Sequence, residues 1–274
     1  MTNPLDDRNI AFVGAGTMAE AFIRGLLARD LVSVEALTAS DPLEARREYL
    51  SRELGIATET SNADAVADAD IVVLAVKPQV LDKVLSGLEE QVARETLVLS
   101  IVAGAPIAPI RQALDITSVV RIMPNTPGQV GEGISVWTAT PETSEAQREQ
   151  AQAVVSALGK EIHVENEDYL DMATALSGSG PAYVFLFIEA LIDAGVQMGF
   201  SRDIARALAL QTVRGAAIYA QETDEHVAVL RNMVTSPGGT TAEALYRFEK
   251  GGLRAMVSEA VLAAYQKAKD LGDS

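Results

Sequence analysis

The chain has 274 residues, of which 48% are hydrophobic, so it can bury a sizeable core and does not have the composition of a disordered protein. Acidic residues outnumber basic ones by 38 to 22, and the formal net charge of −16 argues against a partner such as nucleic acid, whose phosphates require a basic surface. The absence of cysteine excludes disulfides, thiol nucleophiles and thiolate metal sites, and two histidines are too few for an imidazole metal cluster.

We expect no segment that lies in a membrane or directs secretion. No apolar run approaches the roughly 20 residues that span a bilayer, and the richest one, residues 182–196, is interrupted by Glu189 and Asp193. Residues 1–7 do not combine a basic segment with a following apolar one. These features predict a cytoplasmic protein.

The first part of the chain alternates short apolar runs with amphipathic helical patterns. Strands are predicted at residues 10–13, 34–39, 71–76, 97–100, 119–122, 134–137 and 161–164. Helices are predicted at residues 17–28, 43–54 and 145–157. This alternation indicates an α/β domain with a parallel sheet covered by helices on both faces.

Helical patterns alone follow after about Asn166. They cover residues 181–198, 202–221, 241–250 and 253–270, and Gly-rich or capped breaks separate them. Glu167, Asp168 and Asp171 are typical of an acidic helix start, which the helix dipole favours. We predict a domain boundary near Glu165, with an α/β domain at residues 8–165 and an all-helical domain at residues 166–274.

A glycine-rich turn follows the first strand. Gly14 permits a tight turn, Gly16 allows a pyrophosphate to approach the backbone, and the small Ala19 allows the helix to lie close to the strand. In this strand–turn–helix context the pattern G-x-G-x-x-A predicts a dinucleotide site. The alternative for Thr17 is structural, because Thr17 and Glu20 have the spacing of a capping box.

The residue after the second strand bears on the choice of coenzyme. Asp41 would accept hydrogen bonds from a ribose and repel a 2′-phosphate, which favours NADH over NADPH. Arg46 and Arg47 follow one helical turn later and could compensate for that repulsion. The alternative is that Asp41, before Pro42, starts the next helix. We expect either coenzyme to be usable, with a slight preference for NADH.

Five motifs in order resemble those of the pyrroline-5-carboxylate reductases. They are VGAGTM at residues 13–18, AVKPQ at 75–79, MPNTP at 123–127, LSGSGPAY at 176–183 and VTSPGGTT at 234–241. The resemblance covers nearly the whole chain and implies a Rossmann domain followed by an all-α dimerisation domain. It also implies dimers of interleaved helices, which can assemble into decamers. The implied reaction is hydride transfer from NADPH or NADH to the C=N bond of 1-pyrroline-5-carboxylate, giving L-proline.

The resemblance also implies roles for individual residues. Residues of the glycine turn would bind the pyrophosphate: Gly14, Ala15, Gly16, Thr17 and Met18. Asp41 and Asn62 would contact the adenosine half of the coenzyme. Two further groups would line the nicotinamide ribose and ring: Ala75, Val76, Lys77 and Pro78, and then Ile101, Val102 and Ala103. A late turn would bind the substrate: Gly238, Gly239, Thr240 and Thr241. The predicted catalytic residues are Thr241 and Asp224.

Two positions depart from the family pattern. Met233 stands where many relatives have an amide that reaches the cofactor, so we expect that contact to be absent. Asp224 replaces a longer acid of some relatives, and the neighbouring Glu225 could take its role.

The late turn also has the features of an anion-binding site. A glycine-rich loop that opens a helix directs backbone amides at one point, and the helix dipole favours a carboxylate there. The alternative for Thr240 is a capping box with Glu243, and for Thr241 an ordinary place in the first turn.

The residue types suit the reduction of an imine. A protonated cyclic imine is already electrophilic, so no acid is needed beside it, whereas ketone reduction needs a proton donor. The helical pattern at 181–198 has no lysine, which argues against a 3-hydroxy acid dehydrogenase. For Lys77 a catalytic role competes with shaping of the backbone, and for His226 a proton shuttle competes with a solvated loop position.

Two other functions remain open at this point. A reductase of another cyclic imino acid is compatible with the sequence, because one methylene group is worth only ~1–3 kcal/mol of discrimination. A non-catalytic nucleotide-sensing protein would keep the first glycine turn, but it would have no reason to retain the late turn.

Overall fold

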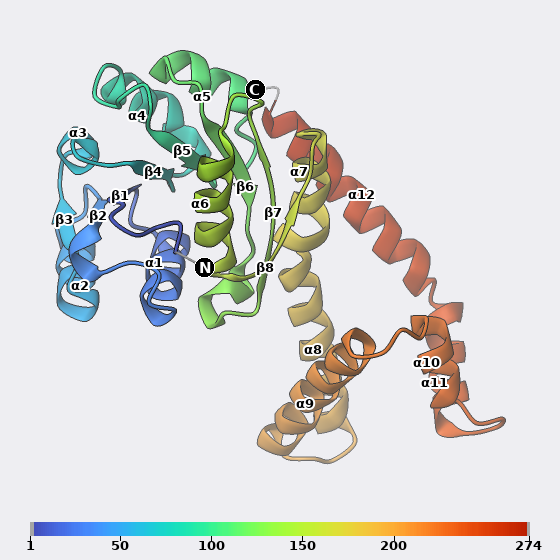
Figure 1. Cartoon of the computed structure of the whole chain (residues 1–274). Helices are drawn as coiled ribbons and strands as arrows, with labels where there is room; N and C mark the ends of the chain where they lie inside the picture. Colours follow the sequence, from blue (N-terminus) through green and yellow to red (C-terminus); the bar gives the residue numbers. More distant parts are fainter. Residues whose placement is uncertain (1–2, 273–274) are drawn as a thin grey trace. The chain divides into compact units, whose positions relative to one another are not determined.

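The computed structural model describes residues 3–272 (Figure 1). The chain divides into two compact units. The first comprises Met1–Ser179 and Ala264–Ser274, and the second comprises Gly180–Ala263. The predicted boundary near Glu165 corresponds to the end of the last strand, and the first unit continues beyond it to Ser179 because the following helix packs on the sheet.

The first unit contains a single sheet of eight strands within the described residues. Their order is β3-β2-β1-β4-β5-β6-β7-β8, and every neighbouring pair is parallel except β6 and β7. The strands are β1 (Ile10–Val13), β2 (Leu37–Ser40), β3 (Ala57–Glu59), β4 (Ile71–Leu74), β5 (Leu97–Ser100), β6 (Val119–Met123), β7 (Gly133–Ala139) and β8 (Gly159–His163). The central strands β1, β4 and β5 are buried on both faces, as their continuous apolar runs predict.

Helices cover both faces of this sheet (Figure 1). One layer consists of α1 (Thr17–Ala28), α2 (Glu44–Leu54) and α6 (Glu145–Ser156), and its core includes Phe12 and Phe22. The other consists of α3 (Asn62–Val66), α4 (Leu81–Leu88) and α5 (Ile107–Leu114), and its core includes Leu74 and Leu85. Alternate residues of each strand point into the two layers, so the sheet is the centre of a doubly wound α/β fold.

The strand order reverses between β1 and β4. The chain proceeds from β1 to β2 and β3 on one side, and from β4 to β5 and β6 on the other. In open α/β sheets, ligands bind in the crevice at the carboxyl ends of the strands at such a switch point. The turn that begins at Gly14 lies there.

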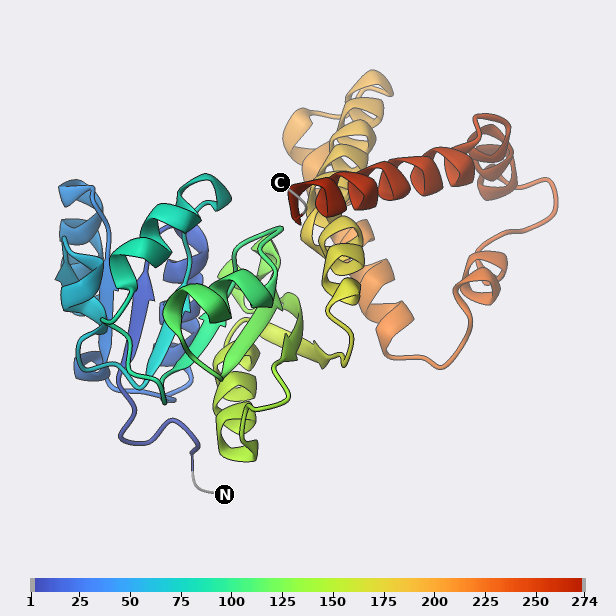
Figure 2. The same ribbon diagram turned by 90° about the horizontal axis from the view of Figure 1, so that it is seen from above.

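Helices α7 (Asp168–Ala173) and α8 (Gly180–Gln197) are joined by a π-helical segment, Thr174–Gly178. The second unit contains α8, α9 (Arg202–Gln221), α10 (Val227–Met233), α11 (Thr240–Lys250) and the beginning of α12 (Leu253–Gly272). Figure 2 shows α8 and α9 running side by side. Gly195 makes this close packing possible, because a Cβ there would lie 2.8 Å from the Cβ of Ala205.

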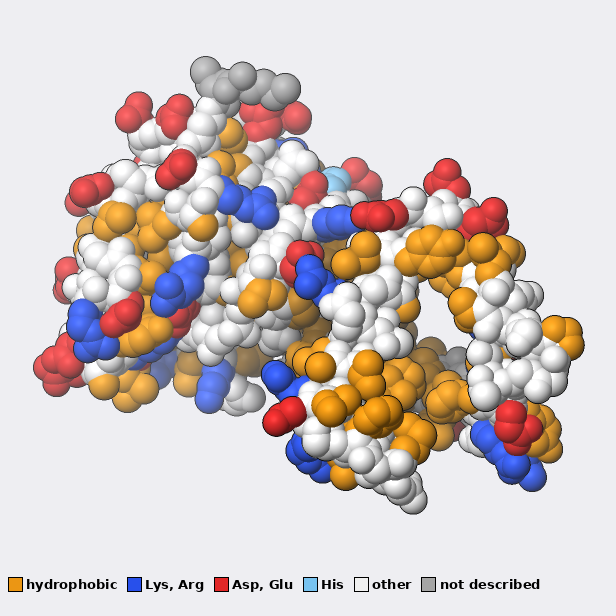
Figure 3. Space-filling model, turned by 90° about the horizontal axis from the view of Figure 1, so that it is seen from below, with side chains coloured by type: hydrophobic (Ala, Val, Ile, Leu, Met, Phe, Trp, Pro, Cys, Tyr) orange, Lys and Arg blue, Asp and Glu red, His pale blue; other side chains and the backbone are white. Residues whose placement is uncertain are grey.

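Large apolar side chains remain exposed on the helices of the second unit. Leu186 of α8 is 68% exposed, and Phe185 and Leu208 are also exposed. Figure 3 shows hydrophobic side chains gathered over the surface of the C-terminal helices. Soluble monomers rarely expose a large contiguous apolar patch, so this surface requires a partner.

The continuous helical run Asp168–Gln197 is long and apolar enough, by length and composition, to cross a membrane. The expectation that no segment reaches this length is therefore wrong. It relied on the charges of Glu189 and Asp193, but two charged residues do not interrupt the helix or lower its hydropathy enough. Almost none of the run's most apolar 18-residue window is buried within the described chain.

Most predicted elements agree with the structure, but residues 34–39 were assigned wrongly in part. Val34–Ala36 forms a short 3-10 turn, and only Leu37–Ser40 pairs with β1. Several short elements were not predicted, namely β3, α3, α4, α5 and α10. Short helices and edge strands depend on tertiary burial more than on their own sequence, so their pattern is weak.

Candidate active site

The turn after β1 is shaped to receive an anion. Gly14 has φ +93°, and a Cβ there would lie 2.8 Å from the carbonyl oxygen of Ala75. A Cβ on Gly16 would meet no atom within 4 Å, so the space before this residue is open. Gly16 is the N-cap of the 12-residue α1, and no side chain of the described residues caps this helix. Its first-turn amides therefore fit a diphosphate.

Thr17 does not form the capping box that its spacing with Glu20 suggested. It is the first residue of α1, after the N-cap. The Glu20 carboxylate instead accepts hydrogen bonds from Arg24 Nε at 2.8 Å and Arg46 Nη2 at 2.6 Å. Two guanidinium groups bind a carboxylate more strongly than one backbone amide does. The structural alternative for Thr17 is therefore wrong.

Asp41 lies directly after β2 and contacts the glycine turn. Its Oδ2 accepts a hydrogen bond from Ala15 N at 3.2 Å, and its Oδ1 accepts one from Leu43 N at 2.9 Å. Asp41 thus contacts both the glycine turn, through Ala15, and the N-cap residue of α2, Leu43. Asn62, the first residue of α3, is held near the end of β2 because its Oδ1 accepts a hydrogen bond from the Ser40 hydroxyl at 2.8 Å.

The residues predicted for the nicotinamide half follow β4 and β5, at the same edge of the sheet. Ala75 N donates to Val13 O at 2.8 Å, which continues the pairing of β4 with β1 up to the turn. Val76 is half-buried, whereas Lys77 and Pro78 are exposed. After β5, Ile101 and Ala103 are half-buried, but the Val102 side chain is buried in the core below the sheet. Val102 can therefore offer a ligand only its backbone.

The second glycine turn precedes α11 and lies in the second unit. Gly238 has φ +69°, and Gly239 is the N-cap of a helix of 11 residues. No side chain of the described residues caps this helix, so the amides at its beginning suit a carboxylate. Thr240 is exposed and Thr241 is half-buried, and both belong to the first turn of α11.

The capping box proposed for Thr240 is also wrong. Glu243 pairs with Arg247 at 2.8 Å, one turn further along the helix, instead of turning back to the N-cap. The two glycine turns thus share one property: each opens a helix of more than ten residues without a side-chain cap among the described residues.

The loop between α9 and α10 contains the other predicted catalytic residue. Asp224 and Glu225 are both exposed there. His226 is the N-cap of α10, and its Nδ1 accepts a hydrogen bond from Ala228 N at 3.1 Å. This contact gives His226 a structural role. Met233 ends α10 and is exposed.

A buried arginine was not predicted from the sequence. The Arg121 side chain is 6% exposed, and its guanidinium donates to Glu167 at 3.0 Å and to Asp171 at 2.7 Å. Glu167 also accepts a hydrogen bond from Ile107 N at 2.9 Å. The acidic start of α7 therefore fixes this helix to β6 and α5, in addition to any effect of the helix dipole.

Asn125, in the motif at 123–127, connects two segments that are distant in sequence. Its Nδ2 donates to Ser177 O at 3.2 Å, and its Oδ1 accepts from Ile134 N at 3.0 Å. Nearby, a Cβ on Gly178 would lie 2.7 Å from Met123 Cε. The motifs at 123–127 and 176–183 thus pack against each other. The position of an asparagine between two prolines was the only local signal for this role.

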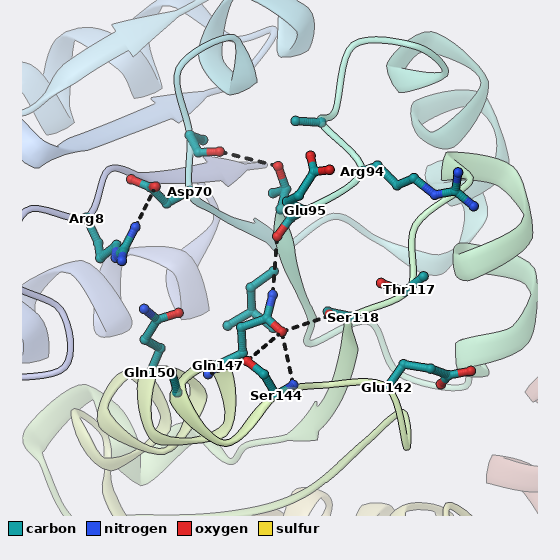
Figure 4. Close-up of a pocket in the computed structure, with 15 residues that line it drawn as sticks. Arg8, Asp70, Arg94, Glu95, Thr117, Ser118, Glu142, Ser144, Gln147 and Gln150 are labelled. Atoms are coloured by element: carbon teal, nitrogen blue, oxygen red, sulfur yellow. Dashed lines mark hydrogen bonds and ion pairs between the residues drawn. The ribbon is translucent and has the colours of Figure 1, made fainter.

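A separate hollow of about 670 Å³ lies at the amino ends of β5 and β6 (Figure 4). Figure 4 shows the Arg8–Asp70 ion pair on one side and the capping box of Ser144 and Gln147 below it. Ser118 donates to Gln147 at 2.9 Å. None of the residues predicted for coenzyme or substrate lines this hollow within the described chain. Those predicted for the coenzyme follow the carboxyl ends of the strands, at the opposite edge of the sheet, and those predicted for the substrate belong to the second unit.

The sheet, its switch point and the uncapped glycine turn define a class of protein, the NAD(P)H-dependent oxidoreductases. Two family models agree with this class: an F420-dependent NADP oxidoreductase model matches residues 9–104, and a pyrroline-5-carboxylate reductase dimerisation model matches residues 167–271. A pyrroline-5-carboxylate reductase of Synechocystis is 42% identical over 96% of this chain and 98% of its own length. The chain belongs to the pyrroline-5-carboxylate reductase family.

Solved structures of the family have the same fold. The pyrroline-5-carboxylate reductase of Coxiella burnetii has a TM-score of 0.89 at 36% identity, covering 97% of this chain and 99% of its own. The Plasmodium falciparum enzyme, solved with NADP bound, has a TM-score of 0.89 at 32% identity, and the match covers 97% of this chain and 98% of its own. The prediction of an α/β Rossmann domain followed by an all-α dimerisation domain is confirmed.

Proposed function

We propose that this chain catalyses the last step of proline formation, the reduction of 1-pyrroline-5-carboxylate to L-proline by NADH or NADPH. One observation carries the proposal beyond family membership: each unit contains a glycine turn that opens a long helix without a side-chain cap among the described residues. The reaction involves two anions, the coenzyme diphosphate and the substrate carboxylate, and one turn suits each of them.

The first unit would bind the coenzyme, which supplies a hydride from its nicotinamide ring when bound. The amides of Gly16, Thr17 and Met18 bind the diphosphate at the open face of the turn. Asp41 accepts hydrogen bonds from the adenosine ribose, and Asn62 adjoins it. The backbone after β4 and β5, at Ala75–Pro78 and Ile101–Ala103, orients the nicotinamide end.

The second unit would bind the substrate. The amides of Gly239 and Thr240 hold its carboxylate at the start of α11, and the Thr241 hydroxyl hydrogen-bonds near the ring nitrogen. The imine nitrogen arrives protonated, so the protein needs to position it and not to donate a proton. Asp224 supplies a negative charge that favours this cationic form.

The helices of the second unit would form a homodimer. Exposed apolar side chains on α8, including Phe185, Leu186 and Phe187, are suited to a dry contact between subunits. The dimerisation family model spans these helices. The apolar run Asp168–Gln197 is then covered by a second copy and not by lipid. Further assembly to a decamer and a cytoplasmic location belong to this proposal, and we expect no nucleic-acid or membrane partner.

The proposal is tested by following the absorbance of reduced coenzyme with synthetic pyrroline-5-carboxylate, separately with NADH and NADPH. Oxidation of coenzyme that depends on substrate, with L-proline as the product, is the expected result. The six-membered cyclic imino acid is the comparison substrate, and it should be reduced with a lower kcat/KM. Binding of coenzyme without turnover of either imine would instead support a nucleotide-sensing protein.

A further inference from the structure

Arg46 is held against the glycine turn by several contacts. Its guanidinium donates to Glu20 Oε2 at 2.6 Å, and it also donates to the carbonyl oxygens of Ala15 and Gly16. The same group lies over the Tyr49 ring, 5.1 Å from the ring centroid. The Arg46 side chain is 24% exposed. These contacts engage the guanidinium on more than one side, so it is not a freely moving surface cation.

Glu20 is the centre of this network. Besides Arg46, its carboxylate accepts hydrogen bonds from Arg24 Nε at 2.8 Å and from the Tyr49 hydroxyl at 3.1 Å. Its side chain is 16% exposed. Desolvation by burial raises the pKa of Glu20, but the hydrogen bonds from Arg46, Arg24 and Tyr49 outweigh it and leave the pKa below its ordinary value. Glu20 therefore stays ionised at neutral pH and retains Arg46.

The ribose end of the predicted coenzyme site lies next to this network. The Asp41 carboxylate, after β2, accepts a hydrogen bond from Ala15 N, and Arg46 donates a hydrogen bond to the carbonyl oxygen of the same Ala15. The other nearby cation, Arg47, donates its Nη1 to the backbone oxygen of Asp41 at 2.7 Å. A 2′-phosphate placed here would meet the Asp41 carboxylate, while Arg46 is already bound to Glu20.

We propose that Glu20 is a positioning residue for coenzyme selectivity: by holding Arg46 on the glycine turn, it withholds this guanidinium from a ribose 2′-phosphate. Asp41 then dominates the ribose end, and the coenzyme without the phosphate is preferred. This inference rests on the coenzyme site of the proposed function, but not on the identity of the imine. Glu20 itself touches neither coenzyme nor substrate.

The test compares the binding of two small ligands to the full-length protein by calorimetry: 5′-AMP, and 2′,5′-ADP, which adds only the 2′-phosphate. In the unmodified protein we expect 2′,5′-ADP to bind no more tightly than AMP. Glu20→Gln removes the charge and keeps the shape. It should increase the affinity for 2′,5′-ADP by about tenfold, which is the effect of one charge-assisted hydrogen bond, and leave the affinity for AMP nearly unchanged.

Two further variants separate positioning from a general structural role. Arg24→Gln removes another partner of Glu20 but leaves the Arg46 contact, so the ratio of the two affinities should not change. In the double variant Glu20→Gln with Arg46→Met, the gain for 2′,5′-ADP should disappear. The same selectivity should be visible as a higher ratio of kcat/KM for NADPH to that for NADH in Glu20→Gln alone.

Three outcomes would overturn the inference. The first is an unchanged ratio of the two affinities in Glu20→Gln, and the second is an equal loss of affinity for both ligands in that variant. The third is a selective loss of affinity for 2′,5′-ADP in Arg46→Met alone, which would show that Arg46 already reaches the phosphate. Failure of the proposed function looks different. A protein that binds AMP and NADH but reduces no imine would contradict that function and leave the selectivity test intact.

Discussion

The Arg121 guanidinium donates a hydrogen bond to the Asp171 carboxylate at 2.7 Å, and this contact joins strand β6 to α7, the first helix after the sheet. With Glu167 it forms an ionic cluster in which the arginine side chain is almost inaccessible to water and the two carboxylates are partly exposed. Such clusters contribute little net stability over apolar packing, but their loss leaves unpaired charges. The cluster explains why the first compact unit extends past β8 to Ser179.

Arg121→Met should destabilise the protein by about 2 kcal/mol, because the Asp171 and Glu167 carboxylates, which are only partly exposed, lose hydrogen bonds from a charged donor. The free energy of unfolding from chemical denaturation measures this effect. Arg111→Met is the matched control, since its ion pair with Glu142 lies at the exposed surface and contributes about 0–1 kcal/mol. Equal losses in the two variants would show that burial of Arg121 has no energetic importance.

The two glycines of the first turn should respond differently to substitution. Gly16→Val places its side chain in open space where the diphosphate is expected, so it should raise the Kd for NADH at least about tenfold and cost about 1 kcal/mol of stability or less. Gly14→Ala combines a positive φ with a Cβ only 2.8 Å from a carbonyl oxygen, so it should lower stability. Fluorescence titration and thermal unfolding measure the two effects. Tight NADH binding by the Gly16 variant would place the diphosphate elsewhere.

Asp41→Ser should raise the ratio of kcat/KM for NADPH to that for NADH, because it removes the negative charge at the ribose end. Ala15 N and Leu43 N lose the carboxylate as their acceptor in this variant. The serine hydroxyl can still accept a hydrogen bond from Leu43 N, so the start of α2 should be retained. Steady-state kinetics with both coenzymes are the measurement. A ratio that stays the same would show that the carboxylate does not face the ribose.

Thr241→Ala should raise the KM for pyrroline-5-carboxylate by about tenfold, since one hydrogen bond to a charged substrate is lost, while the KM for the coenzyme changes far less. Ser86→Ala on α4 removes an exposed hydroxyl elsewhere and should change neither value. If the substrate KM is insensitive to Thr241→Ala, this threonine has no contact with the substrate.

The apolar surface of α8 predicts an obligate dimer with an interface above ~2,000 Å². Leu186→Asp should therefore either prevent the protein from accumulating on expression or yield monomers in sedimentation velocity experiments. Val130→Asp is the control: Val130 is 77% exposed in the first unit, and its substitution should leave the mass unchanged. A stable and active monomer of the unmodified chain would contradict the prediction.

The sequence predicted those features of the fold that depend on neighbouring residues. The strand before Gly14, the turn and the helix from Thr17 to Ala28 are encoded within one short segment, so their positions were predicted correctly. In the second unit, the helix Arg202–Gln221 has a side-chain cap, because the Ser201 hydroxyl accepts a hydrogen bond from Ile204 N, and it was predicted with its observed ends.

The features that were missed depend on residues far apart in the chain. Glu20 and Thr17 have the spacing of a capping box, but Arg46, far along the sequence, binds the carboxylate instead. Arg121 in an apolar strand gives no sign of its partners on α7. Local spacing shows which contacts are geometrically allowed, and the folded chain determines which of them the charged groups make.

The chain passes between its two compact units twice, once after Ser179 and once within α12. The helical unit is therefore an insertion, and both flanking segments belong to the sheet-containing unit, where Leu271 packs on Gly104. A single proteolytic cut in the loop at Asp224 would leave each fragment attached to that unit, so nicked protein should migrate as one species until it is denatured. For the same reason, exchange of this insertion between relatives requires two matched junctions.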